Sequence, residues 1–198
     1  MKRIKIYCTI AILTLTTTLV SAQYSLFTLS YSTGMTLGKT ADYIDNYSWR
    51  GMGIEGRYFI EKDLSLGFYV AWNVFNQSLI NYNQEFENGV LYGNQYRYIN
   101  AYPILMMAHY HFLPNSAVRP YLCAGLGVYS MNRRTEMGLY YSETKSWHFG
   151  VQPEAGLWFD VAPYVNLIIA AKYNYAVKTN KSDAYSFLNF NIGMTFVY

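Results

Sequence analysis

Apolar and polar residues alternate along most of the chain beyond residue 24. In residues 165–175, for instance, Val165, Leu167 and Ile169 share one parity, while Lys172 lies on the other. Alternation with a period of two predicts a strand that has one apolar face and one wetter face. Eight such segments are predicted, at residues 24–38, 48–60, 64–75, 94–112, 119–131, 146–159, 165–175 and 185–198.

The predicted connections alternate in length. Short ones follow the second, fourth and sixth segments, at 61–63, 113–118 and 160–164. Longer, polar ones follow the first, third, fifth and seventh segments, at 39–47, 76–93, 132–145 and 176–184. Short turns at one end and long loops at the other, with an even number of strands, are typical of a bacterial outer-membrane barrel. A sandwich with Greek-key links does not sort its loops this way. The predicted fold is therefore all-β, an eight-stranded antiparallel up-and-down transmembrane β-barrel.

Several predicted strands carry charged residues on their less apolar face. A basic residue that faces lipid at mid-membrane costs about 2–4 kcal/mol, so these side chains are expected to point into the barrel. A barrel of this size has room inside only for side chains, and a buried ion without a partner costs several kcal/mol. We therefore predict a network of paired interior charges, made of Glu55, Arg57, Arg97, Glu154 and Lys172.

The N-terminus has the layout of an export signal. A short basic stretch, MKRIK, precedes an uncharged apolar run, and small side chains end at Ala22. This pattern predicts a cleaved secretory signal at residues 1–22, with cleavage between Ala22 and Gln23, and a barrel domain at residues 23–198. The apolar run is shorter than the roughly 20 residues that a spanning helix needs.

Removal of the predicted signal changes the charge of the chain. Three of the 15 basic residues lie in the signal, so 12 basic and 12 acidic residues remain. A formally neutral chain gives no electrostatic reason to expect nucleic acid as a partner. Cys123 is the one cysteine that follows the signal, so an internal disulfide is not expected. The spacing typical of a zinc or haem site is absent from the sequence, and we expect no cofactor.

The C-terminal stretch NIGMTFVY continues the strand alternation to the last residue. Asn191, Gly193, Phe196 and Tyr198 stand at the positions of a recurrent terminal motif. On this motif the chain resembles the small outer-membrane β-barrel family, the group of OmpX and the membrane domain of OmpA. The stretches RPYLCAGLGVY and FGVQPEAGLWFDVAPYVNLIIAAKYNY resemble Bacteroidetes-type members. The resemblance implies that these four residues form an assembly signal read by the barrel-assembly machinery. It also implies a location among the lipid and lipopolysaccharide of a Gram-negative outer membrane.

Two other groups of residues are candidates for chemistry. His109 and His111 share one face of a predicted strand and are a possible start of a metal site, but the sequence shows no further ligand. Polar lining of the barrel rim is the alternative for this pair. Ser146, His148 and Glu143 are the types of residue that a lipid-modifying hydrolase uses. Such a triad is recognised by its geometry, which sequence does not give.

The expected function is that of a non-enzymatic surface protein. Loops on a stiff scaffold are a common place for recognition, and the loops at 76–93 and 132–145 are the longest predicted here. We expect them to meet an extracellular partner, which the sequence does not identify. The alternatives are a small or gated pore, which would open when the interior charges change partners, and a lipid-modifying outer-membrane enzyme.

Overall fold

The structure, a computed structural model, describes residues 25–86, 89–180 and 182–198. The predicted signal at residues 1–22 and its cleavage site between Ala22 and Gln23 lie outside the described residues. A 3₁₀ helix, η2, spans Gly38–Thr40. The strands are β1 (Ser25–Thr36), β2 (Arg50–Phe59), β3 (Leu64–Phe86), β4 (Gly89–His111), β5 (Val118–Met137), β6 (Tyr140–Ala162), β7 (Val165–Ala176) and β8 (Tyr185–Val197).

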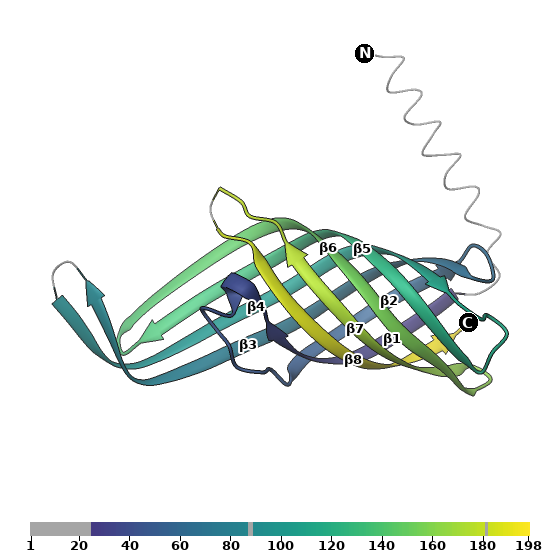
Figure 1. Ribbon diagram of the computed structural model, residues 1–198, viewed down its shortest axis with the longest axis horizontal. Helices are drawn as coiled ribbons and strands as arrows, with labels where there is room; N and C mark the ends of the chain where they lie inside the picture. Colours follow the sequence, from purple (N-terminus) through teal and green to yellow (C-terminus); the bar gives the residue numbers. More distant parts are fainter. Residues whose placement is uncertain (1–24, 87–88, 181) are drawn as a thin grey trace, which may run out of the picture.

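The strands follow one another around a closed antiparallel barrel, each hydrogen-bonded to the next in sequence (Figure 1). The ring closes where β1 pairs with β8, from Leu26 opposite Val197 to Thr36 opposite Phe187. Closure leaves this part of the sheet without a free edge. The predicted fold, an eight-stranded up-and-down barrel, is confirmed.

The period-two alternation sets which side chains face outward. On β1 and β8, Thr28, Ser30 and Asn191 are buried inside, while the residues between them face away from the barrel. Because neighbouring strands of the ring pair their backbone groups with one another, an apolar exterior of this kind suits a hydrocarbon environment. Large apolar side chains are exposed on the outer face: Phe27, Leu29, Ile54, Phe68, Met106, Leu126, Phe149 and Ile192.

Side chains fill the lumen, and it is less polar than the sequence predicts. Phe75 and Phe187 meet with ring centroids 5.3 Å apart, and Tyr129 packs edge-on against Phe187. Ile44, from the connection between β1 and β2, is fully buried and belongs to the same apolar core. The expectation of a polar interior is therefore correct only for part of the length of the barrel axis. A buried apolar layer lies toward the long-loop end.

No helix within the described part of the chain is long and apolar enough to cross a membrane.

Four strands continue beyond the ring as two long hairpins (Figure 1). The pairing of β2 with β3 stops at Arg50 opposite Val74, and the pairing of β6 with β7 starts at Gly150 opposite Ala176. Beyond these points β3 pairs only with β4, and β5 links β4 to β6. We call this part, the described residues of 76–98 and 132–148, the protruding sheet.

The prediction of long loops at 76–93 and 132–145 is therefore wrong for most of both ranges. Buried side chains such as Gln95 and Ser146 remain at the base of the protruding sheet. Farther from the ring neither face meets lipid, so the strands lack the apolar alternation that marks a strand with one apolar face. Asn is frequent here and is depleted in strands generally. Backbone pairing across the hairpins nevertheless continues up to Phe86 opposite Gly89 and Met137 opposite Tyr140.

Candidate functional site

Pairing between neighbouring strands brings a row of reactive side chains together inside the barrel. His109 of β4 lies opposite Cys123 of β5, Cys123 lies opposite Glu154 of β6, and Glu154 lies opposite Lys172 of β7. Directly opposed residues have Cβ atoms about 5 Å apart. All four side chains are buried. The regular register of the strands is thus enough to assemble the row.

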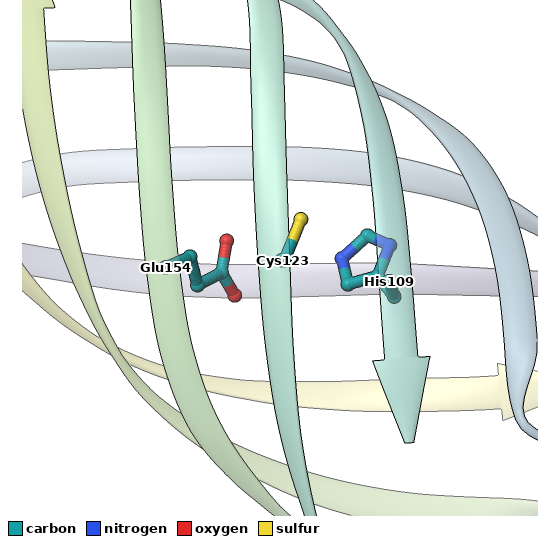
Figure 2. Close-up of side chains that lie close together, drawn as sticks. All are labelled: His109, Cys123 and Glu154. Carbon is teal, nitrogen blue, oxygen red and sulfur yellow. The ribbon is translucent and has the colours of Figure 1, made fainter.

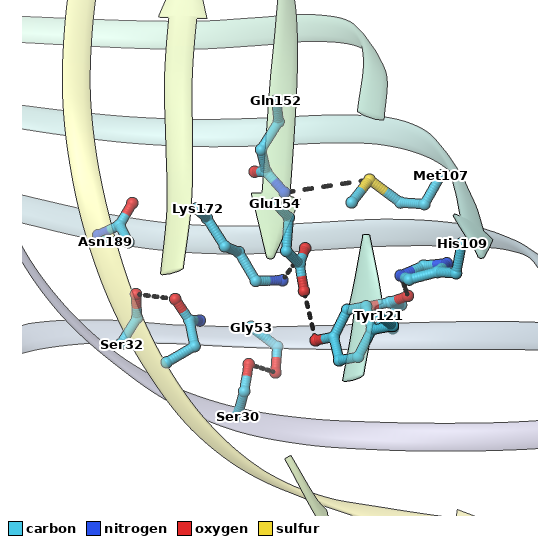
Figure 3. Close-up of polar contacts among 12 residues, drawn as sticks. Ser30, Ser32, Gly53, Met107, His109, Tyr121, Gln152, Glu154, Lys172 and Asn189 are labelled. Carbon is cyan, nitrogen blue, oxygen red and sulfur yellow. Dashed lines mark hydrogen bonds and ion pairs between the residues drawn. The ribbon is translucent and has the colours of Figure 1, made fainter. Parts of the chain in front are cut away.

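The buried charges of the lumen form two ion pairs. Arg57 donates from Nε to Glu55 Oε1 at 2.5 Å and from Nη2 to Glu55 Oε2 at 3.2 Å. Lys172 Nζ lies 3.1 Å from Glu154 Oε2, and Tyr121 donates its hydroxyl to Glu154 Oε1 at 2.6 Å (Figure 3). Two cations and two carboxylates balance one another, so the cluster holds no net formal charge.

Aromatic rings complete the shell around the two cations. Lys172 Nζ lies 3.9 Å from the centroid of the Tyr69 ring, and Arg57 Cζ lies 5.3 Å from that of Tyr121. A cation held over an aromatic face gains electrostatic stabilisation that grows when water is excluded. Sequence patterning did not single out Tyr69 or Tyr121 for this role. Their inward parity on β3 and β5 is the signal that could have done so.

Arg97 lies apart from the other four residues of the predicted network. Its Nε donates to Gln95 Oε1 at 2.6 Å, and its Nη1 donates to the backbone oxygen of Tyr43 at 3.1 Å. Its guanidinium also packs over the rings of Tyr43 and Tyr82. Arg97 therefore connects the protruding sheet to the β1–β2 connection.

A possible metal-ligand set forms around His109, but its partners differ from those considered in the sequence. One ligand atom each of His109, Cys123 and Glu154 lies within 4.8 Å of the others (Figure 2). His111 instead approaches Ser65, with 3.3 Å between Ser65 Oγ and His111 Nε2. Because the charges around Glu154 already balance, an added dication would leave excess positive charge buried, which is costly. The arrangement favours a structural network.

Ser146 and His148 contact each other at the other end of the lumen. Ser146 Oγ lies 2.7 Å from His148 Nε2, and His148 Nδ1 lies 2.8 Å from the backbone oxygen of Val177. Glu143, the acid that the sequence suggested, points elsewhere and accepts a hydrogen bond from Asn132 Nδ2 at 2.8 Å. That hydrogen bond, with a smaller contribution from Lys145, holds the pKa of Glu143 below its usual value. No side-chain pattern signals the contribution of Val177, because it comes from the backbone.

The four residues of the expected assembly signal lie along β8. Asn191 points inward and accepts a hydrogen bond from Ser32 Oγ at 3.3 Å, while Gly193 lies opposite Ser30 of β1. Phe196 lies opposite Phe27. Tyr198 follows the strand, and its side chain is largely exposed. These residues belong to the seam at which the barrel closes.

Comparison with known proteins gives a result for structure only. No family model matches the chain, and no curated protein matches it in sequence. Among solved structures, the chain is similar to Neisserial surface protein A, with 18% identity and a TM-score of 0.54 over 87% of this chain and 95% of that one. It is also similar to Ail, the attachment invasion locus protein of Yersinia pestis, with 14% identity and a TM-score of 0.54 over 89% and 99% of the two chains.

A third similar structure is the N-terminal β-barrel domain of Pseudomonas aeruginosa OprF, with 15% identity and a TM-score of 0.50 over 90% of this chain and all of that one. The chain has an outer-membrane β-barrel fold. At these identities the likeness extends to the fold alone. A barrel of this fold, with an apolar outer face, crosses a bilayer with its strands.

Proposed function

We propose that the main role of this chain, an integral protein of the outer membrane of a Gram-negative bacterium, is non-enzymatic: it binds an extracellular partner through its protruding sheet. The observation that carries the proposal is the shape of that sheet. It continues four strands beyond the ring and ends in outer edges that the ring does not cover. A stiff barrel that presents such a sheet suits recognition better than chemistry.

The outer edge of β6 is the more regular of the two edges. Among the described residues, no strand pairs with β6 on this side from Tyr140 to His148; the first bond is Val177 N to Phe149 O at 2.8 Å. The outer edge of β3 has a register irregularity between Leu79 and Tyr82. An extended segment of a partner can add to a regular free edge through backbone hydrogen bonds. We therefore assign the partner's main contact to β6.

Side chains around this edge supply contacts beyond the backbone. Tyr140 and Tyr141 are largely exposed, and the guanidinium of Arg134 lies 5.6 Å from the centroid of the Tyr141 ring. Tyrosine provides a large contact area at a low cost in conformational entropy. Glu143 and Lys145 pair at 3.3 Å on the same strand. The edge therefore offers aromatic area together with charges of both signs.

The alternative function, a small pore, has less support from the lumen. Phe75, Tyr129 and Phe187 are buried across its upper part. Below them, the two ion pairs and their aromatic neighbours occupy the interior. Opening would require these side chains to move and the pairs to separate. Single-channel conductance of the refolded protein in a planar bilayer separates the two proposals.

Peptide display tests the proposed binding mode without knowledge of the natural partner. A library of extended peptides on phage is selected against the folded protein in lipid nanodiscs. In one variant residues 133–144 are replaced by Asn-Gly, a sequence suited to a two-residue hairpin turn; Asn132 and Lys145, which are paired, then flank the turn. In the matched control residues 79–95 are replaced in the same way, between the paired Ser78 and Tyr96.

We expect selected peptides to bind the wild type and the control but not the variant with the shortened β5–β6 hairpin. Protection of β6 amides from hydrogen exchange should accompany binding, because the partner's backbone would occupy them. Failure to select any peptide, or equal binding by both shortened variants, would contradict the assignment to β6.

A further inference from the structure

The binding role proposed above makes no use of the Ser146–His148 pair. The hydrogen bonds of this pair fix which ring nitrogen of His148 carries the proton. The backbone oxygen of Val177 is only an acceptor, so His148 Nδ1, 2.8 Å away, carries the proton. In the neutral ring Nε2 then has a free lone pair and accepts the proton of Ser146 Oγ, 2.7 Å away. A serine that donates to an oriented imidazole is the arrangement of an activated nucleophile and its general base.

A second serine–histidine pair at the opposite end of the lumen lacks these features. Ser65 Oγ lies 3.3 Å from His111 Nε2, which is longer by 0.6 Å than the contact of Ser146. His111 Nδ1 is buried and has no hydrogen-bond partner among the described residues. Its tautomer is therefore not fixed by a backbone acceptor. This pair provides a comparison within the same barrel.

A polar cavity of about 240 Å³ lies at the long-loop end of the barrel and is lined by neighbours of the Ser146–His148 pair, although not by the pair itself. Thr144, two residues before Ser146 on the same face of β6, lines it, and so does Tyr185, whose ring meets His148 edge-on at 5.2 Å. Thr144 is exposed, and Ser146 keeps 6% of its surface accessible. The cavity therefore leads from the solvent to the immediate neighbours of Ser146, whose small accessible surface is the part that a reagent must reach.

Arg133 is the cation of this cavity, whose lining also includes Asp183; the carboxylate of Asp183 is paired with Lys178 Nζ at 3.3 Å. Arg133 lies opposite Thr144, one inward-facing step from the pair of Met131 and Ser146. Its guanidinium is held 3.7 Å from the centroid of the Tyr43 ring. A guanidinium placed beside a serine nucleophile can bind a carboxylate of the substrate or the negative charge that develops on a carbonyl oxygen.

We propose that Ser146 is a nucleophile that cleaves small acyl esters bearing a carboxylate, with His148 as its general base and Arg133 as the group that binds the carboxylate. Ser146 Oγ attacks the ester carbonyl carbon while its proton passes to His148 Nε2. The bond to the leaving alcohol oxygen then breaks, and that oxygen takes the proton from His148. Water then attacks the carbonyl carbon of the acylated Ser146 while His148 Nε2 accepts its proton. The bond from that carbon to Ser146 Oγ breaks, Oγ takes the proton from His148, and the free acid leaves.

Covalent labelling tests the nucleophile directly. The folded protein in detergent is treated with a small fluorophosphonate, which a reactive serine attacks through its oxygen with loss of fluoride, and the adduct is located by peptide mass spectrometry. We expect one adduct, on Ser146, that is absent from Ser146→Ala and forms at least ~100-fold more slowly in His148→Gln, the scale of general-base catalysis. Ser65→Ala should label as the wild type does.

An unlabelled wild type, an adduct that persists in Ser146→Ala, or an unchanged rate in His148→Gln would overturn the proposal. The heat-dependent gel shift of folded barrels reports whether each variant is assembled. If His148→Gln does not assemble, the comparison of Ser146→Ala with Ser65→Ala still decides where the adduct forms.

Ester hydrolysis tests the substrate class. The nitrophenyl monoester of succinic acid carries a free carboxylate, and nitrophenyl acetate is its neutral counterpart. We expect the wild type to prefer the succinyl ester, and Arg133→Gln to slow hydrolysis of the succinyl ester more than that of the acetyl ester, so that the preference falls. Equal rates for the two esters in the wild type would remove Arg133 from the proposal. Failure of the peptide selection above would leave these outcomes unaffected, because labelling and hydrolysis depend on the side chains of Ser146, His148 and Arg133, whereas peptide binding depends on the backbone edge of β6.

Discussion

The embedded barrel and the protruding sheet contain the same kinds of interaction in opposite environments. Lys172 and Glu154 form an ion pair inside the barrel with side chains exposed by 2% and 0%. Arg134 and Glu136 form one on the protruding sheet with side chains exposed by 49% and 32%. Loss of one partner leaves the other charge buried and unpaired in the first case, and solvated by water in the second. Stability is therefore expected to depend on where a residue lies, and the following variants test this.

The largest effect is expected from Glu154→Gln. This substitution leaves the ammonium of Lys172 buried without a carboxylate, and loss of one partner of a buried pair costs about 3–5 kcal/mol. The free energy of unfolding in urea, for protein folded reversibly into phospholipid vesicles, measures it. Replacement of both residues, with Glu154→Gln and Lys172→Met together, should recover most of the loss. Equal destabilisation by the single and the double variant would contradict the pairing of these two residues.

A charge on the lipid-facing surface should have the next largest effect. Leu126 lies on the outer face of β5 and is 52% exposed. Leu126→Arg is expected to lower the free energy of unfolding by about 2–4 kcal/mol, the cost of a basic residue near the bilayer midplane. Ile80→Arg is the matched control, because Ile80 is 75% exposed on the protruding sheet. Similar losses in both variants would mean that the apolar outer face does not meet lipid.

Glycine substitutions should separate the close contacts of the barrel from the open spacing of the protruding sheet. A Cβ atom at Gly127 would collide with the backbone oxygen of Ile104 and lie 3.0 Å from Leu105 Cα. At Gly93 the nearest atom would be Met137 Cε, at 3.9 Å. Gly127→Ala should therefore cost about 1–3 kcal/mol, as overpacking does, and Gly93→Ala close to nothing. The same urea titration measures both, and a reversed order would contradict the described packing.

Among the variants that should lower stability, Arg134→Ala is expected to have the smallest effect. Its ion pair with Glu136 is exposed on the protruding sheet, where such pairs contribute about 0.2–1 kcal/mol. High salt should reduce that contribution further, since exposed charges are screened. An Arg134→Ala loss as large as that of Glu154→Gln would remove the contrast between the two regions.

The sequence predicts the barrel well because each embedded strand has one face in lipid. That constraint produces the alternation of residues 165–175, and it places Glu55, Arg57, Glu154 and Lys172 inside. No such constraint acts beyond the membrane, which is why residues 76–93 and 132–145 do not read as strands. The alternation assigns a side chain to a face of the sheet but does not give its position along the barrel axis.

Pairing within the lumen depends on height, and there the sequence falls short. Arg97 shares the inward parity of the buried charges, yet it lies near Tyr43 at the long-loop end. The sequence also does not predict the apolar layer around Phe75 and Phe187, because its pattern does not distinguish aromatic residues that face inward from those that face outward. The orientation of His148 depends on the backbone oxygen of Val177, just after β7, and a backbone contact of this kind is not visible in a pattern of side chains.

The central claim is that a closed, filled barrel carries a protruding sheet that performs the function. Single-channel conductance of the refolded protein in a planar bilayer tests it most directly, with insertion verified by protection of the barrel from protease. We predict that the wild type gives no discrete conductance steps, because side chains from Phe75 down to the Glu154–Lys172 pair occupy the lumen. Reproducible steps that change in Glu154→Gln or Lys172→Met would contradict the claim and would make the barrel a pore.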